Sequence, residues 1–183
     1  MHKDIKEILF TEEEIAARVK EIGGALTDEY SQRVDAGEKV MLISVLRGAA
    51  IFMADLARAT EVPMEMDYMA VSSYGSGVKS SGVVSIVKDL TSSIEGKHVV
   101  VVEDILDSGL TLQFLMETLQ ARNPASIEVV TLLRKLNREQ AHIDCAHVGF
   151  ECPDEFIVGY GLDYAERYRN LPYIGILKPE VYA

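Results

Sequence analysis

The sequence predicts an α/β protein with a mostly parallel, twisted sheet and helices on both of its faces. Apolar runs typical of buried strands lie at residues 40–46, 99–102 and 127–133. Helical patterns separate these runs, so strand and helix alternate along the chain. Such alternation usually builds a parallel sheet covered on both faces. The 183 residues suit one domain with a sizeable core, so we expect residues 1–183 to form a single domain.

The first helical pattern begins after Thr11. The segment Thr11-Glu-Glu-Glu14 has the spacing of a capping box, in which two backbone N–H groups at the helix start are satisfied reciprocally. Four apolar residues then recur at helical spacing: Ile15, Val19, Ile22 and Leu26. The pattern predicts an amphipathic helix with this face toward the core.

A second unit of strand, turn and helix follows. The strand at 40–46 leads into the tight turn Arg47-Gly48-Ala49-Ala50, and a helix ends before Pro63. Residues 64–72 are predicted as a further strand, with apolar Met66 and Tyr68 alternating against acidic neighbours. Residues 73–82 are polar and rich in glycine, which is typical of a mobile surface loop.

The segment 98–112 carries the strongest chemical signal. A run of valines reads as a buried strand that we expect to end near Val102, where Glu103 and Asp104 follow. A turn of small and polar residues comes next and opens a helix over 110–121. A helix N-terminus can bind a phosphate through its backbone N–H groups, and carboxylates can accept hydrogen bonds from sugar hydroxyls or hold a hard cation. The pattern predicts a site for a phosphorylated sugar.

Composition narrows the partners. The net charge of −11 argues against a nucleic-acid or anionic-membrane binder, since both need clustered Lys and Arg. Cys145 and Cys152 are too few for a disulfide framework and are expected to be free thiols. No signal peptide or membrane span is recognisable, so a cytoplasmic location is expected.

The segment Glu103-Asp-Ile-Leu-Asp-Ser-Gly-Leu-Thr111 resembles the phosphoribosyl-pyrophosphate (PRPP) motif of the type I phosphoribosyltransferases. Further segments, up to about residue 175, are similar to the branch that salvages hypoxanthine and guanine. The resemblance implies the type I fold with a small base-binding hood built from the chain ends. It also implies transfer of a 5-phosphoribosyl group from PRPP to N9 of hypoxanthine or guanine, giving IMP or GMP and pyrophosphate, with Mg²⁺ as cofactor and a homodimeric or homotetrameric assembly.

The resemblance also implies roles for single residues. Glu103 and Asp104 would bind the ribose hydroxyls, partly through Mg²⁺, with Asp163 near the same ion. Asp107 would be the general base near N7 of the purine. The 5′-phosphate would be held by the turn and the first helical residues: Asp107, Ser108, Gly109, Leu110 and Thr111.

The departing pyrophosphate and the lid are assigned in the same way. Arg47 and Gly48 match the family's pyrophosphate loop, which has a cis peptide bond before the position of Arg47. Arg169 would also hold pyrophosphate. Ser73 and Tyr74 match the family's flexible lid, within the loop at about 73–82, whose closure would exclude water from the reacting centre.

The purine would be held by residues from the last third of the chain. Lys135 corresponds to the lysine that donates to the purine 6-oxo group, and its neighbour Arg134 is the main rival for that role. Phe156 would stack on the base, and Ile157 would offer main-chain contacts to its edge.

Three other functions are weighed against this one. The chain could serve another base, such as xanthine, adenine or a pyrimidine, although Lys135 and the Phe156 segment speak against adenine. It could be a PRPP-sensing regulator that binds RNA, which the net charge disfavours. It could be a binding module with a dead site, although every position that we matched carries competent chemistry.

Overall fold

The computed structural model describes residues 1–73, 84–136, 138 and 140–182. Its main sheet has the strand order β4-β3-β2-β5-β6-β7. These strands are β2 (Val40–Val45), β3 (Glu65–Ser73), β4 (Val84–Lys88), β5 (His98–Leu106), β6 (Ser126–Lys135) and β7 (His147–Cys152). Only the edge pair β3–β4 is antiparallel within this described sheet. The predicted, mostly parallel sheet is therefore confirmed.

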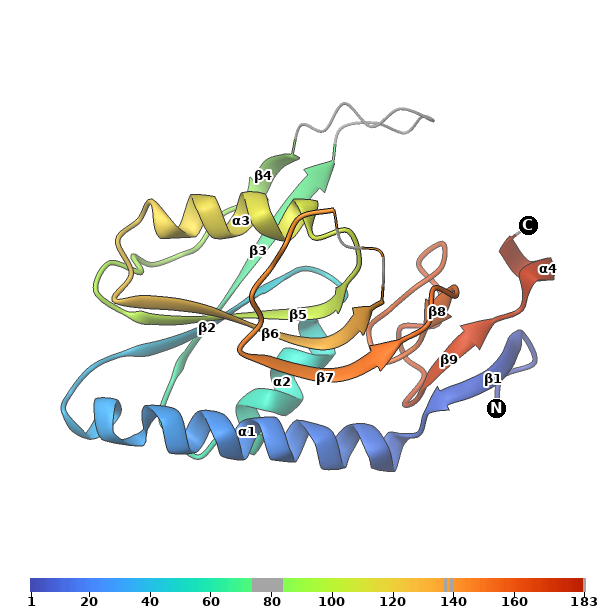
Figure 1. Ribbon diagram of the computed structural model, residues 1–183, viewed down its shortest axis with the longest axis horizontal. Helices are drawn as coiled ribbons and strands as arrows, with labels where there is room; N and C mark the ends of the chain where they lie inside the picture. Colours follow the sequence, from blue (N-terminus) through green and yellow to red (C-terminus); the bar gives the residue numbers. More distant parts are fainter. Residues whose placement is uncertain (74–83, 137, 139, 183) are drawn as a thin grey trace.

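Helices cover both faces of this sheet (Figure 1). Helices α1 (Glu12–Asp35) and α2 (Ala50–Ala59) pack on one face, and α3 (Leu110–Gln120) packs on the other. The run of valines in β5 serves both layers. Val100 and Val102 belong to the core under α1 and α2, whereas Val99 and Val101 belong to the core under α3. Successive strand residues face opposite sides, which is why this central strand is apolar throughout.

The start of α1 follows the predicted capping box. The hydroxyl of Thr11 accepts from the backbone N–H of Glu14 at 3.2 Å, and the Glu14 carboxylate accepts from the backbone N–H of Thr11 at 2.8 Å. The predicted apolar face is buried, and the structure adds Tyr30 to it. A helix of this length is stabilised mainly by packing that face on the sheet.

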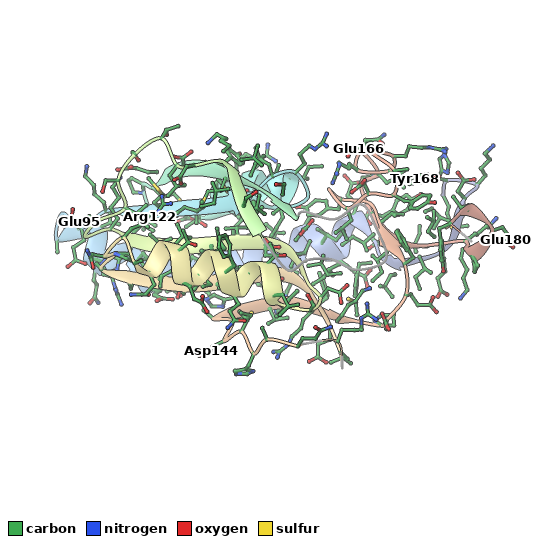
Figure 2. The ribbon with its side chains drawn as sticks, turned by 90° about the horizontal axis from the view of Figure 1, so that it is seen from above. Glu95, Arg122, Asp144, Glu166, Tyr168 and Glu180 are labelled. Atoms are coloured by element: carbon green, nitrogen blue, oxygen red, sulfur yellow. The ribbon has the colours of Figure 1, made fainter. Side chains whose placement is uncertain are left out.

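A second sheet joins the two ends of the chain, as Figure 1 shows. Strand β9 (Ile174–Leu177) lies between β1 (Ile5–Phe10) and β8 (Ile157–Val158), and both pairs are antiparallel. The short helix α4 (Pro179–Tyr182) follows. The predicted hood of chain ends is confirmed, although strand β1 was not predicted. Glu166, Tyr168 and Glu180 lie at this end of the molecule, opposite Glu95 and Arg122 (Figure 2).

One predicted boundary is wrong. Strand β5 does not end near Val102 but continues to Leu106. The pairing with β2 stops at Val102, whereas β6 continues alongside and pairs with Glu103, Ile105 and Leu106. Because β6 extends farther than β2, the two carboxylates lie on a strand that has lost one neighbour. As successive strand residues, their side chains project to opposite faces of the sheet.

The facing of β3 also differs from the predicted alternation. Asp67 is buried, and Met66 is 43% exposed. The buried carboxylate accepts hydrogen bonds from the backbone N–H and hydroxyl of Thr91 at 2.6 and 2.8 Å, and from the backbone N–H of Tyr68 at 2.7 Å. Since buried charges are tolerated when they are well hydrogen-bonded, apolar alternation alone could not assign the faces of this strand.

Two predictions from composition can be compared with the described residues. Cys145 and Cys152 are free thiols, as predicted. None of the helices in the described part of the chain is both long enough and apolar enough to cross a membrane.

Candidate active site

The turn between β5 and α3 encloses a small pocket of about 120 Å³. That volume is on the order of four water molecules, which suits a phosphate group better than a whole nucleotide. Gly109 opens α3 with a φ of +78°, and a Cβ there would lie 2.7 Å from the carbonyl oxygen of Ala141. Glycine is therefore needed on both counts. The first N–H groups of a helix have no intrahelical partner, so this turn can receive an anion.

Two consecutive acidic residues of β5 have few partners. The Oε2 atom of Glu103 is buried and has no hydrogen-bond partner among the described residues. Burial, and then repulsion from Asp104, raises the pKa of the Glu103 carboxyl well above its usual range. Burial also raises the pKa of Asp104 to about 6, although the backbone N–H of Ile105 opposes this. The pair is short of positive charge and of hydrogen-bond donors.

The turn after β2 packs directly on the carboxylate of Asp104. A Cβ added to Gly48 would lie 1.7 Å from Oδ2 of Asp104, so only glycine allows this approach. The peptide bond between Leu46 and Arg47 is cis. The cis bond that the resemblance implied is therefore present. A third segment reaches the same place, because a Cβ on Gly161 would lie 2.1 Å from the carbonyl oxygen of Gly48.

Arginine side chains converge on this contact from the chain's last third and from the turn. Arg169 donates from Nη1 to the carbonyl oxygen of Gly161 at 2.7 Å, and its Nη2 lies 2.8 Å from Oδ1 of Asp163. Its Nε is buried and has no hydrogen-bond partner among the described residues. The exposed side chain of Arg47 pairs with Glu166 at 2.9 Å. A buried donor without a partner is costly unless a ligand satisfies it.

A cluster of opposite charges lies at the ends of β5 and β6. Lys135 is 12% exposed, and its Nζ is 3.7 Å from Asp107 and 3.5 Å from Asp154. Arg138 donates from Nε to Asp107 at 3.2 Å, and this carboxylate raises the pKa of Arg138. Asp107 is therefore flanked by two cations beside the small pocket.

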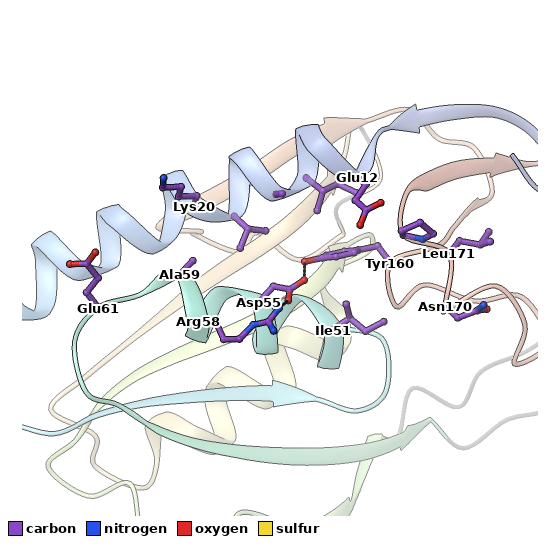
Figure 3. A pocket seen from close by; sticks show the side chains of 14 residues that line it. Glu12, Lys20, Ile51, Asp55, Arg58, Ala59, Glu61, Tyr160, Asn170 and Leu171 are labelled. Carbon is purple, nitrogen blue, oxygen red and sulfur yellow. Dashed lines mark hydrogen bonds and ion pairs between the residues drawn. The ribbon is translucent and has the colours of Figure 1, made fainter.

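A larger cleft of about 660 Å³ lies elsewhere, between α1, α2 and the segment 160–172 (Figure 3). Its lining is largely apolar, and two of its charged groups, Asp55 and Arg58, pair with each other. Neither the carboxylate pair nor the turn before α3 lines it. Size alone would select this cleft. Among the described residues, however, Glu103 and Arg169 each have a buried charged atom without a partner, so we assign the candidate active site to the region of these two residues.

Comparison with known proteins shows the family of this chain. Residues 12–165 match the phosphoribosyl transferase domain family. The chain belongs to this family. It is 53% identical to a hypoxanthine-guanine phosphoribosyltransferase of Bacillus subtilis over 100% of this chain and 98% of that protein. It is also 53% identical to the protein of that name from Mycobacterium avium, over 98% of this chain and 89% of that one.

Solved structures of the family have the same fold. A crystal structure of a hypoxanthine phosphoribosyltransferase from Staphylococcus aureus superposes with a TM-score of 0.93 at 51% sequence identity. The superposition covers 100% of this chain and 97% of that one. The type I fold that the resemblance implied is confirmed.

The structure brings most of the predicted residues of this phosphoribosyltransferase together. Gly48, Asp104 and Gly161 are in contact, with Arg169 bonded to the last of them. The small pocket is lined by several of the predicted PRPP residues: Glu103, Asp107, Ser108, Gly109 and Thr111. Leu110 is the first residue of α3 and is exposed.

The predicted base residues lie around the hood and the end of β6. Phe156 stacks on Tyr182 with ring centroids 4.9 Å apart, and its carbonyl oxygen accepts from the backbone N–H of Leu177 at 2.8 Å. Ile157 begins β8 and is 7% exposed. Arg134 and Lys135 are adjacent on one strand and face opposite sides, and it is Lys135 that reaches Asp107.

The rest of the predicted set is less complete. Asp163 is engaged by Arg169 and by the backbone N–H of Glu166, at 2.8 and 2.9 Å. Within the described residues, no three acidic, histidine or cysteine side chains form a ready metal cluster. Ser73 ends β3, whereas Tyr74 and most of the predicted lid at 73–82 lie outside the described residues.

Sequence reasoning missed three charged residues of this region: Arg138, Asp154 and Glu166. Arg138 follows the strand that carries Lys135 by three positions, so its place beyond a strand end was a usable signal. The other two had none, because an isolated Asp or Glu in a loop is ordinarily a solvated surface residue.

The carboxylate pair fits the family's divalent cation. Among the described residues, Oε2 of Glu103 is an acceptor without a donor, and a cation there would offset the burial that raises the pKa of both carboxyls. Mg²⁺ is usually bound by one or two carboxylates together with substrate oxygens, so a cluster of three protein ligands is not required.

Proposed function

We propose that this protein is a purine salvage enzyme that transfers the 5-phosphoribosyl group of PRPP to N9 of hypoxanthine and guanine. The products are IMP or GMP and pyrophosphate. One observation carries the proposal: a buried acceptor on Glu103, next to Asp104 in β5, and a buried donor on Arg169, which bonds to Gly161 beside Gly48, have no hydrogen-bond partner among the described residues. A ligand with sugar hydroxyls and a pyrophosphate group would satisfy both. The relatives that carry hypoxanthine-guanine names support the choice of base.

The turn between β5 and α3 binds the 5′-phosphate. Ser108 and Thr111 supply hydroxyl donors, and the residues from Asp107 to Thr111 supply backbone N–H groups at a helix N-terminus. Leu110 contributes through its backbone, since its side chain is exposed. Glu103 and Asp104 accept hydrogen bonds from the ribose hydroxyls.

Pyrophosphate leaves from the side of Asp104 that faces the turn at Gly48. Arg47 and Arg169 stabilise its charge, and Gly48 lets the backbone approach it. The Nε of Arg169, which has no partner among the described residues, would donate a hydrogen bond to pyrophosphate. Binding by donors already in place stabilises developing charge without a reorganisation cost at the moment of reaction.

Mg²⁺ would be held by Glu103 and Asp104, with Asp163 nearby. When bound, the ion supplies positive charge to the hydroxyls and to the departing pyrophosphate. Among the described residues, Asp163 already has Arg169 as partner, so its contribution to the ion is the weakest of the three.

The base enters between Lys135 and the hood. Lys135 donates a hydrogen bond to the 6-oxo group of the purine. The amino group of adenine cannot accept that hydrogen bond. Phe156 stacks on the ring, and the backbone of Ile157 lines its edge. Asp107 takes the proton from N7 as general base, and Lys135 and Arg138 keep its carboxylate at the edge of the pocket.

The larger organisation follows from the same resemblance. The chain acts as a single phosphoribosyltransferase domain, assembles as a homodimer or homotetramer, and works in the cytoplasm. Size-exclusion chromatography with light scattering of the purified chain tests the assembly.

Initial rates with PRPP and Mg²⁺ against hypoxanthine, guanine, xanthine and adenine test the function. We expect turnover with hypoxanthine and guanine. Activity with adenine alone would overturn the role of Lys135. Absence of turnover with all four bases, together with a salt-dependent RNA shift, would favour the regulator.

A further inference from the structure

Tyr160 connects the segment 160–172, called the hood segment below, to helix α2 through one partly buried hydrogen bond. The side chain is 7% exposed, and its hydroxyl donates to Oδ2 of Asp55 at 2.7 Å. Figure 3 shows the ring crossing from the hood segment toward α2. Asp55 also accepts from Arg58, one turn farther along the helix. Burial raises the pKa of Tyr160, so its hydroxyl keeps its proton and remains a donor.

The backbone next to this side chain forms part of the proposed pyrophosphate site. Tyr160 has a φ of +49°, and Gly161 has a φ of +102° and lies against the carbonyl oxygen of Gly48. Gly161 and Arg169 exchange two hydrogen bonds. The guanidinium of Arg169 donates to the Gly161 carbonyl at 2.7 Å, and the Gly161 N–H donates to the Arg169 carbonyl at 2.9 Å.

Helix α2, at the other end of the bond, begins directly after the turn that holds Arg47 and Gly48. The Tyr160–Asp55 hydrogen bond therefore ties the element that carries Arg169 to the element that carries Arg47. On one side Tyr160 has little packing around it, because it lines the cleft of about 660 Å³. A single directed hydrogen bond has correspondingly more influence on where the segment lies.

We infer that Tyr160 is a positioning residue for the pyrophosphate half of the active site. It acts through Gly161 on Gly48 and Arg169, and it touches no substrate itself. The inference rests on the proposed function, in which Arg47, Gly48 and Arg169 hold pyrophosphate. It extends the site to a side chain that lines the larger cleft rather than the pocket at the PRPP motif.

The base half of the site should be insensitive to this bond. Lys135 belongs to β6. Phe156 directly precedes the short strand β8, and its carbonyl oxygen accepts a hydrogen bond from the backbone of Leu177 in β9. Loss of the Tyr160 hydroxyl should therefore affect PRPP and pyrophosphate more than it affects hypoxanthine. A purely structural role would lower stability and leave both substrates unaffected or affect both alike.

The decisive variant is Tyr160→Phe, which keeps the ring and removes the hydroxyl. We expect the KM for PRPP and the Kd for Mg-pyrophosphate, measured by calorimetry, to rise roughly fivefold, the size expected for one lost hydrogen bond. The KM for hypoxanthine should change less than about twofold. The matched control is Tyr168→Phe, which removes a hydroxyl that donates to Asp4 at 2.8 Å in the hood. It should leave both constants unchanged.

A second pair of variants separates the hydrogen bond from the bulk of the side chains. Asp55→Asn keeps an acceptor for Tyr160 and should bind PRPP nearly as the wild type does, whereas Asp55→Ala should match Tyr160→Phe. The double variant Tyr160→Phe/Asp55→Ala should be no worse than either single variant, since both remove the same bond.

Three outcomes overturn the inference: unchanged PRPP and pyrophosphate constants in Tyr160→Phe, an equal rise for hypoxanthine, or additive losses in the double variant. Failure of the proposed function has a different signature. In that case the wild-type chain itself gives no turnover in the rate assay, whatever the calorimetry of the variants shows.

Discussion

Gly48 and Asp104 are in close contact, because the carboxylate of Asp104 lies where a side chain on residue 48 would begin. Their strands are neighbours in the sheet, with Ser44 of β2 opposite Val102 of β5. The turn after β2 therefore folds over the carboxylate that follows in β5. This contact joins the proposed pyrophosphate loop to the proposed ribose site.

Replacing Gly48 by alanine should weaken substrate binding without unfolding the protein. The new Cβ would lie 1.7 Å from Oδ2 of Asp104, and the end of a side chain can move where backbone cannot. The displaced carboxylate should raise the KM for PRPP at least about tenfold, or about 1.4 kcal/mol. Steady-state kinetics and calorimetry with Mg-PRPP measure this effect.

Gly24→Ala is the matched control for that substitution. Gly24 lies on the exposed side of α1, and a Cβ there would contact nothing within 4 Å. Alanine should leave the kinetics unchanged and stabilise the helix by about 0.5–1 kcal/mol. A PRPP constant for Gly48→Ala equal to that of the control would show that the contact with Asp104 is not functional.

Asp107→Asn should lower turnover strongly and keep PRPP binding measurable. The amide cannot accept the N7 proton, but the turn still offers its hydroxyls and helix N-terminus to the 5′-phosphate. A loss of about 10²–10⁴ in kcat is typical when a general base is removed. The exposed Asp144 provides the control Asp144→Asn. Turnover within a few-fold of wild type would contradict the assignment of Asp107 as base.

Glu103→Gln should make the metal-free protein more stable and a poorer enzyme. Burial and Asp104 raise the pKa of Glu103, so its charged form is unfavourable in the fold. An amide removes that charge and should raise Tm in chelator, by about 2–4 °C if the gain is ~1 kcal/mol. Mg-PRPP should bind more weakly, which calorimetry can measure. A lower Tm with unchanged binding would show that the Glu103 charge serves the fold.

Asp67 should make the protein sensitive to acid. Burial alone would raise its pKa, but the hydrogen bonds from Thr91 and Tyr68, together with Lys88, outweigh burial and lower the pKa from 3.8 to about 2. The folded-state pKa is depressed, so the stabilisation is present above pH 3.8 and is lost as the pH falls toward 2. A shift of this size corresponds to about 2 kcal/mol.

Asp67→Asn removes that titration. The free energy of unfolding, measured with urea at several pH values, should be lower than wild type at pH 7, and the difference should shrink between pH 4 and 2. Asp144→Asn, at an exposed site, should follow the wild-type profile. A constant difference between wild type and Asp67→Asn across that range would contradict the expected role of the charge.

Local patterns predicted the elements that depend on near neighbours. The capping box at Thr11, the apolar face of α1 and the valines of β5 are decided by residues within a few positions, and each appears in the structure. Predictions failed where a distant partner decides. The end of β5 depends on how far β6 extends, and the facing of Asp67 depends on Thr91, which lies 24 residues away.

The sequence by itself determined most of the order of strands and helices between residues 11 and 133, the glycine-opened turn before α3, and the set of charged residues that resembles a PRPP site. Periodicity and turn chemistry act over short ranges, and this information is complete in the chain. Tertiary structure alone decided that Gly48 receives Asp104, that Gly161 closes on Gly48, and that Lys135 rather than Arg134 faces Asp107. These relations join residues far apart in the chain, and their distances exist only once the sheet and the hood have packed.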